Sequence, residues 1–63
     1  MNIGEKVKEK RIEADVTQAT LAKMVDVAPS MICQIERGTK MPTLPLAKQI
    51  ADALGCNIRD FLD

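Results

Sequence analysis

The chain of 63 residues contains no histidine, tryptophan or tyrosine, and its single aromatic residue is Phe61. Histidine is the commonest general base and metal ligand near neutral pH, so its absence removes the usual centre of both kinds of site. Proteins that bind single-stranded nucleic acids stack the bases on several aromatic side chains, which this chain lacks. The composition therefore argues against an enzyme and against a single-strand binder.

Cysteine is scarce as well, with only Cys33 and Cys56. They form no CxxC pair, and two thiols without histidine cannot complete a tetrahedral zinc site. Small secreted scaffolds normally carry more cysteines than this. We therefore expect two reduced thiols in a cytoplasmic, prokaryotic or phage protein, with Cys56 in the core and no metal or cofactor. Cys33 stays open as a redox-sensitive group.

Long hydrophobic runs are also missing. No apolar stretch approaches the ~20 residues that span a membrane, and no signal peptide is visible. A chain of this length forms one domain at most and buries only about 60% of its unfolded surface. We expect a single domain over residues 1–63 with a small core and no membrane segment, and the sequence indicates no small-molecule ligand.

The chain has no net charge, because nine lysine and arginine residues balance nine aspartate and glutamate residues. Proteins that read DNA usually carry a basic patch, so this balance argues mildly against them. Residues 17–42 are nevertheless net positive by one, with Lys23, Arg37 and Lys40 against Asp26 and Glu36. A DNA-binding surface here would be faintly basic and would rely partly on backbone N–H groups and helix N-termini.

Apolar residues recur at helical spacing along the whole chain, and no alternating run indicates a strand. The expected class is all-α, a compact bundle of five short helices. The predicted helices span residues 3–14, 18–25 and 29–37, followed by a fourth between Thr43 and Gly55 and a short fifth after Asn57. Thr17, Thr43 and Asn57 are suitable N-caps, whereas Ala28 is a poor one.

Turn residues separate these helices. We expect a left-handed turn at Asp15, since aspartate tolerates that conformation better than most residues. Pro29 suits the first position of a helix, and Gly38 is a typical left-handed C-cap. In the last helix, Ile58, Phe61 and Leu62 are predicted to close the core. Met24 and Met41 are interpreted as gap-fillers.

The predicted helix over residues 29–37 has two different faces. At about 100° per residue, Ile32 and Ile35 fall together and must face inward. The opposite arc holds the polar or small side chains Ser30, Cys33, Gln34 and Arg37. Glutamine can bind adenine and arginine can bind guanine bidentately. An ordinary solvated helix face shows the same pattern of polar residues. The short helix and the tight turn before residues 29–37 nevertheless favour a DNA-reading unit.

Taken together, these residues resemble the lambda-repressor-like, Cro-type helix-turn-helix domain of the XRE family of small bacterial and phage regulators. The resemblance covers nearly the whole chain and is specific through its order and spacing. The matching positions are Thr17-Gln18, Leu21-Ala22, Val25, Val27, Ile32, Ile35-Glu36-Arg37-Gly38, Pro42, Ile50-Ala51 and Leu54-Gly55.

The resemblance implies a sequence-specific, double-stranded DNA-binding transcriptional regulator, expected to be a repressor. Its third helix, residues 29–37, would enter the major groove of a two-fold operator that a homodimer recognises. Gln18 would meet a phosphate and steady Gln34, and Arg11 and Glu36 would form a structural ion pair. The implied DNA-contacting residues are Thr17, Gln18, Pro29, Ser30, Met31, Cys33, Gln34, Arg37, Thr39 and Lys40.

Three positions depart from the family pattern. Asp26 replaces a usual glycine in the turn, Ala28 replaces a usual serine or threonine cap, and Pro29 can make only apolar base contacts. These departures and the neutral charge leave a second hypothesis, a protein-interaction module such as an antagonist or an antitoxin-like partner. That hypothesis predicts that Met31, Phe61 and Leu62 matter, whereas DNA binding predicts that Gln18, Gln34 and Lys40 do. We expect the dimer contact on the fourth and fifth helices, with Phe61 and Leu62 near the terminus.

Overall fold

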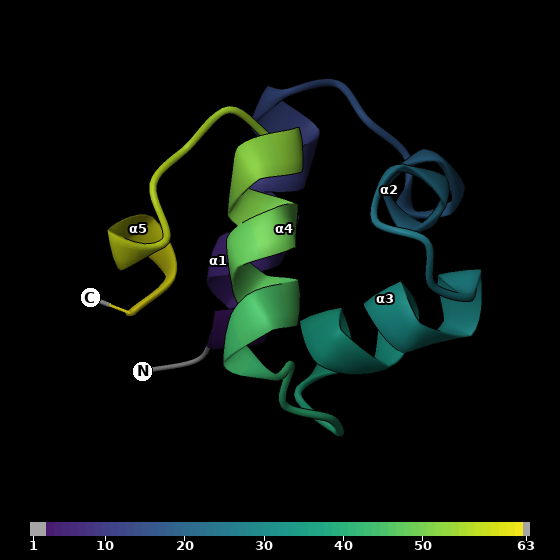
Figure 1. Cartoon of the computed structure of the whole chain (residues 1–63). Coiled ribbons are helices and arrows are strands. Elements are labelled where there is room, and N and C mark those ends of the chain that lie inside the picture. The colour runs from purple at the N-terminus through teal and green to yellow at the C-terminus, as the bar shows by residue number, and fades with distance from the viewer. Residues whose placement is uncertain (1–2, 63) are drawn as a thin grey trace.

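The computed structural model describes residues 3–62, which form five helices and no strand. The helices are α1 (Ile3–Glu13), α2 (Gln18–Met24), α3 (Pro29–Arg37), α4 (Leu44–Ala53) and α5 (Arg59–Leu62). In Figure 1, α4 stands in the centre with α1 behind it, α2 and α3 lie on one side, and α5 lies on the other. α3 packs against α1 and α2, α4 against α2, and α5 against α1. The all-α prediction is confirmed.

The core gathers one apolar face from every helix. Its largest fully buried side chains are Val7, Leu21, Ile32, Ile35, Ile50 and Phe61. Phe61 closes the core as predicted, but the same prediction for Leu62 is wrong, because that side chain is 58% exposed. Consecutive residues of a helix differ by about 100°, so a single turn cannot direct both side chains inward.

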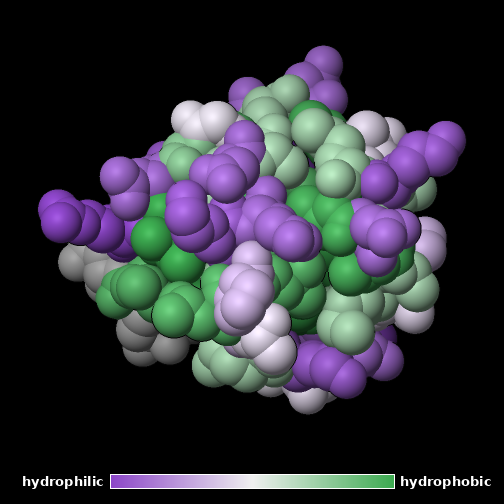
Figure 2. All heavy atoms as spheres, viewed as in Figure 1, coloured by the Kyte–Doolittle hydropathy of each residue, from purple (hydrophilic) through white to green (hydrophobic). Residues whose placement is uncertain are grey.

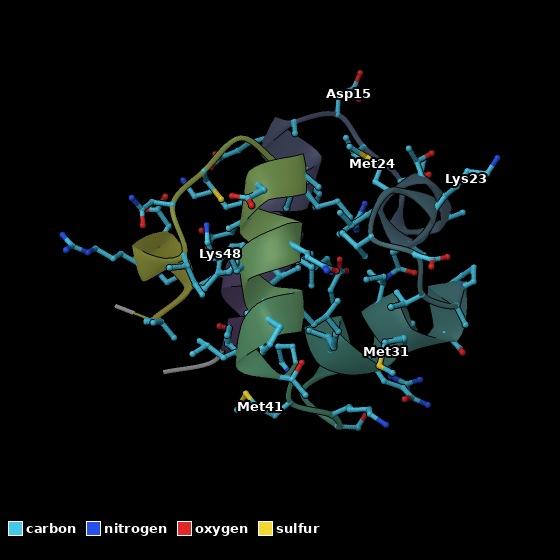
Figure 3. All side chains as sticks on the ribbon, viewed as in Figure 1. Asp15, Lys23, Met24, Met31, Met41 and Lys48 are labelled. Atoms are coloured by element: carbon cyan, nitrogen blue, oxygen red, sulfur yellow. The ribbon has the colours of Figure 1, made fainter. Side chains whose placement is uncertain are left out.

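Two other predictions about apolar residues fail. Met24 and Met41 are not gap-fillers, since 52% and 72% of their surface is exposed. Figure 3 places Met24 at the end of α2 and Met41 in the connection between α3 and α4. Cys56 is half-buried and packs against the core, which confirms its prediction. α1 ends at Glu13, so Ala14, which was expected in this helix, is exposed and lies outside it.

Three helix starts are capped by the predicted side chains, and the start of α3 is not. The Thr17 hydroxyl accepts from the Thr20 N–H at 3.0 Å, and the Thr43 hydroxyl accepts from the Leu46 N–H at 3.3 Å. Asn57 Oδ1 accepts from the Arg59 N–H at 3.1 Å. Each bond satisfies a backbone donor that the first helical turn leaves without a partner. These local bonds fix where the short helices begin.

The turns are left-handed at Asp15 and Gly38, as expected, and also at Asp26. Asp15 and Asp26 both have a φ of 60°, and Gly38 has a φ of 83° at the end of α3. Asp26 therefore adopts the left-handed conformation itself, at the position where the family usually has glycine. The turn then closes through the Val27 N–H, which donates to the Ala22 carbonyl at 2.9 Å. Aspartate can replace glycine here because a short polar side chain tolerates this conformation.

Candidate nucleic-acid interface

α3 is anchored on one side and exposed on the other. Ile32 and Ile35 have no exposed surface, so the helix cannot rotate without uncovering them. On the opposite side Ser30, Gln34 and Arg37 are exposed. We call these three side chains the reading face. The flanking side chains Met31 and Cys33 are half-buried, and Met31 projects from α3 away from α2 in Figure 3.

The start of α3 has no side-chain cap and carries a proline. Ala28 is its N-cap and has an extended backbone, but its methyl side chain makes no capping bond. Pro29 occupies the first turn and is exposed. It has no N–H group to offer a phosphate, so its exposed ring can make only apolar contacts. The first turn of α3 therefore lacks a side-chain cap, which α2 and α4 have, and at Pro29 it also lacks one backbone donor.

The segment after α3 is folded back onto it. The carbonyl of Gln34 accepts the backbone N–H groups of Thr39 and Lys40 at 3.0 and 3.3 Å, and also the Thr39 hydroxyl at 3.2 Å. The left-handed Gly38 makes this reversal, a conformation that disfavours any side chain. Thr39 and Lys40 are exposed. They are thus held at the end of the helix that carries Arg37.

The start of α2 differs from the expectation in one contact. Thr17 caps the helix and also donates its hydroxyl hydrogen to Thr20 Oγ1 at 2.9 Å. The Gln18 amide does not steady Gln34; its Nε2 donates to Glu36 Oε1 at 3.0 Å. A buried carboxylate is a stronger acceptor than the amide of an exposed glutamine, which explains the choice. No spacing in the sequence signals this contact.

Glu36 and Arg11 form the expected ion pair. Arg11 Nε lies 2.6 Å from Glu36 Oε2, and Arg11 Nη2 lies 3.2 Å from Glu36 Oε1. The remaining nitrogen, Nη1, donates to the carbonyl of Val16 at 2.7 Å. The two side chains are only 13% and 3% exposed. One guanidinium therefore joins α1 to α3 and also holds the connection that leads into α2.

Burial of Glu36 changes the charge of the exposed surface. Because Arg11 neutralises this carboxylate, the charges that residues 17–42 show to solvent are Lys23, Arg37 and Lys40 against Asp26 alone. Lys23 extends away from α2 in Figure 3. The surface around α3 is therefore more basic than the sequence count suggests, and its remaining donors are suited to phosphates.

Other parts of the described surface carry apolar side chains and a shallow groove. Figure 2 shows hydrophobic side chains at the surface on both sides of α4. On the α2 side a shallow groove is lined by Met24, Val25, Asp26, Gln49, Asp52 and Ala53. Residues 3–62 contain no group of three or more side chains placed to hold a metal ion. None of the helices described is long and apolar enough to cross a membrane.

Comparison with known proteins identifies the fold. The model of the helix-turn-helix family HTH_3 matches residues 7–61. This chain belongs to the helix-turn-helix family. The match runs from the second turn of α1 to Phe61 and includes every residue of the candidate interface, which confirms the resemblance drawn from the sequence.

Three curated relatives place the chain among regulators of different lengths. It is 36% identical over 61 residues to the control protein C.BamHI of Bacillus amyloliquefaciens, covering 95% of this chain and 75% of that protein. It is 33% identical to the immunity repressor of Bacillus phage phi105, covering 92% of this chain and 40% of that protein. It is 34% identical to an HTH-type transcriptional regulatory protein of Aeropyrum pernix, covering 95% of this chain but only 18% of the relative. The chain thus matches well under two thirds of the last two relatives.

Solved structures share the fold over nearly the whole chain. The biofilm regulator SinR in complex with DNA superposes with a TM-score of 0.90 at 27% identity, covering 97% of this chain and 98% of SinR. The phage P22 c2 repressor in complex with a synthetic operator gives 0.89 at 30% identity, covering 97% and 92%. The fold also forms 34% of HppE, solved with iron and substrate, with a TM-score of 0.86, 26% identity and 95% of this chain covered. The fold alone therefore does not define an activity.

Proposed function

We propose that this protein is a sequence-specific transcriptional regulator, acting as a repressor, which inserts α3 into the major groove of double-stranded DNA. The observation that carries the proposal is the pair of faces on α3. Two fully buried isoleucines, Ile32 and Ile35, hold the helix, while Ser30, Gln34 and Arg37 point outward along one line. Regulators and repressors among its relatives and neighbours support the same assignment.

The exposed side chains divide into base-reading and backbone-binding sets. Gln34 can bind adenine bidentately and Arg37 can bind guanine, while Ser30 suits a base edge or a phosphate. Pro29 and Met31 offer apolar contact to a thymine methyl group, with Cys33 beside them. The backbone-binding set consists of Thr17, Gln18, Thr39 and Lys40. Phosphate contacts of this kind set the position of the helix but carry no sequence information.

One recognition helix reads only a few base pairs, so we infer that two copies bind a two-fold operator with half-sites about 34 Å apart. Leu62 is exposed on α5 and can contribute to the contact between copies. Phe61, which the sequence placed beside it in that contact, is fully buried and supports it only from within the core. Sedimentation that finds only monomers, both free and on operator DNA, would exclude the dimer.

We infer no enzymatic role for this domain. Nucleophilic catalysis by a hydroxyl needs an adjacent base, and the chain has no histidine. The Thr17 hydroxyl is moreover engaged in capping α2. The alternative of a protein-interaction module rests on Met31 and Leu62, because Phe61 is inaccessible.

The decisive experiment is a mobility shift on the double-stranded DNA upstream of the protein's own gene, with excess competitor DNA. Wild type is expected to give a competitor-resistant shift. Gln34→Ala is expected to weaken it by about tenfold or more, because a bidentate base contact is lost. Gln49→Ala, the same change at an exposed position of α4, is the matched control and should leave binding unchanged. If folded wild type binds neither this DNA nor a random-sequence pool at low salt, the proposal fails and a protein partner must be sought.

Salt dependence gives an independent test of the contact surface. With two to four basic contacts per monomer, the slope of log affinity against log salt should lie at about −2 to −4. Lys40→Ala should reduce the magnitude of that slope by about one, since one phosphate contact is lost. A monomer slope steeper than about −7 would mean that the basic surface extends well beyond α3 and its loop.

A further inference from the structure

Glu36 carries one more hydrogen bond than its ion pair explains. Its side chain is 3% exposed, and Arg11 already donates to both of its oxygens. A buried carboxylate needs such partners, so the pair with Arg11 has a plain structural purpose. The third donor is the Gln18 amide, 3.0 Å from Oε1, and it comes from a different helix. Gln18 is also the first residue of α2, in the set that we assign to the DNA backbone.

The chemistry of this contact fixes the orientation of the Gln18 amide. A primary amide donates through nitrogen and accepts through oxygen, whereas a carboxylate only accepts. The nitrogen of Gln18 must therefore face Glu36, and its oxygen must be turned away from it. One amide hydrogen points at the carboxylate, and the other stays available for an acceptor outside the protein.

We propose that Glu36 is a positioning residue for DNA binding, which orients the Gln18 amide toward a phosphate without touching DNA itself. This inference rests on the function proposed above. A glutamine with three rotatable bonds would otherwise have to be ordered when DNA arrives, and ordering weakens binding. Because Glu36 lies on α3, the same contact also sets the start of α2 relative to the reading face. Arg11 acts through Glu36, by holding the carboxylate in place.

A double-mutant cycle on DNA affinity tests the proposal with Glu36→Gln, Gln18→Ala and the double variant. Glutamine at position 36 is an uncharged and weaker acceptor, and it places a donating NH₂ group where one of the two carboxylate oxygens stood, so the contacts of Glu36 with Arg11 and Gln18 are weakened or lost. Each single change is expected to weaken binding by about five- to tenfold, measured where circular dichroism shows the variant folded. The double variant should bind no more weakly than Gln18→Ala alone, because Glu36 acts through Gln18. Effects that multiply would overturn the proposal.

Stability measured on the same four proteins separates positioning from folding. Glu36→Gln should lower the free energy of unfolding mainly through the loss at Arg11 and only to a small extent through Gln18, which makes one of the three hydrogen bonds to this carboxylate. Coupling in affinity without matching coupling in stability is a result that a purely structural role of Glu36 would not give. Equal coupling in both measurements would overturn the positioning role.

A measurement on the wild-type protein covers the case in which Glu36→Gln fails to fold. Side-chain amide signals in a ¹⁵N spectrum can be assigned to Gln18 by their loss in Gln18→Met, with exposed Gln49 as the reference. We expect one Gln18 amide hydrogen to exchange with solvent more slowly than either hydrogen of Gln49, in free protein and on DNA. Equal exchange would overturn the proposal. Absence of DNA binding by wild type would instead contradict the proposed function, and the spectrum of the free protein would still test the Gln18–Glu36 contact.

Discussion

The first three helices, of which α2 and α3 carry the proposed DNA contacts, are joined differently from the two that follow them. Arg11, Gln18 and Glu36 link α1, α2 and α3 through buried hydrogen bonds. α4 and α5 are attached by apolar side chains such as Ile50 and Phe61, and the polar bonds described for them join residues a few positions apart. Apolar burial fixes which face of a helix turns inward, and hydrogen bonds add a required direction between the groups that they join. The difference indicates that orientation matters most among the first three helices.

The largest loss of stability is expected in α4 and α5, the two helices that apolar side chains attach to the rest. Phe61→Ala removes the largest buried side chain and is expected to cost about 3–5 kcal/mol of unfolding free energy. A domain of this size has a total of that order, so the variant should be largely unfolded at 25 °C by circular dichroism. Leu62→Ala is the matched control on the same turn and should cost less than about 0.5 kcal/mol because that side chain is exposed. Similar losses for both would show that α5 contributes through its backbone rather than through Phe61.

A smaller loss of stability is expected when the hydrogen bonds that link α1, α2 and α3 are removed. Arg11→Met keeps the length of the side chain but leaves Glu36 buried without its charge partner, at a cost of about 3 kcal/mol in chemical denaturation. The exposed pair between Lys48 and Asp52, 3.6 Å apart, provides the contrast. Lys48→Met should change stability by less than about 0.5 kcal/mol. If the two variants lost equal stability, the buried network would not be the special feature of the first three helices.

A gain in stability is expected at the start of α3, which has no side-chain cap. Ala28 already has the extended backbone of an N-cap, so Ala28→Ser should add the missing side-chain bond and stabilise the protein by about 1 kcal/mol. Thr43→Ala should cause a similar loss, because it removes the cap of α4. Thermal unfolding of both variants measures the pair. A loss of stability in Ala28→Ser would mean that the serine hydroxyl cannot reach the first turn.

The smallest effect concerns pH and the half-buried Cys56. Burial, helped by the nearby carboxylate of Asp60, raises the pKa of the Cys56 thiol above its usual range. The unfolded chain then loses this proton at a lower pH than the folded protein. The stabilising contribution is therefore complete below the unfolded pKa of about 8.5 and is lost as pH rises through the folded pKa. Denaturation at pH 7 and pH 10 should show a smaller alkaline loss for Cys56→Ala than for wild type, and equal losses would contradict this origin.

Most of the fold could be predicted from the sequence because it depends on local signals. Capping follows from residue type at three helix starts, namely Thr17, Thr43 and Asn57. Helical spacing alone predicts that Ile32 and Ile35 are buried. The exposure of Met24, Met41 and Leu62 could not be predicted, because it depends on where neighbouring helices end. Residue type indicates hydrophobicity, but only packing decides which apolar side chains are covered.

The candidate site was predictable to the same extent. The outward direction of Ser30, Gln34 and Arg37 follows from the period of one helix. The partner of Gln18 does not, since it depends on the distance between two helices and on competition between two acceptors. The Val16 carbonyl, which holds Arg11, carries no side-chain signal at all. Side-chain directions within one helix follow from its period, whereas of the contacts between helices only the pair of Arg11 and Glu36 was expected, through the resemblance to the family.

The way the loop after α3 is attached has a consequence for how such a protein can change its target. Thr39 and Lys40 are bound to the carbonyl of Gln34, not to its side chain. Substitution at position 34 therefore leaves the loop attached, and the outward side chains can vary while the scaffold that presents them is inherited unchanged. A descendant of this gene could therefore recognise a different DNA sequence after one or two codon changes, while its fold stays the same.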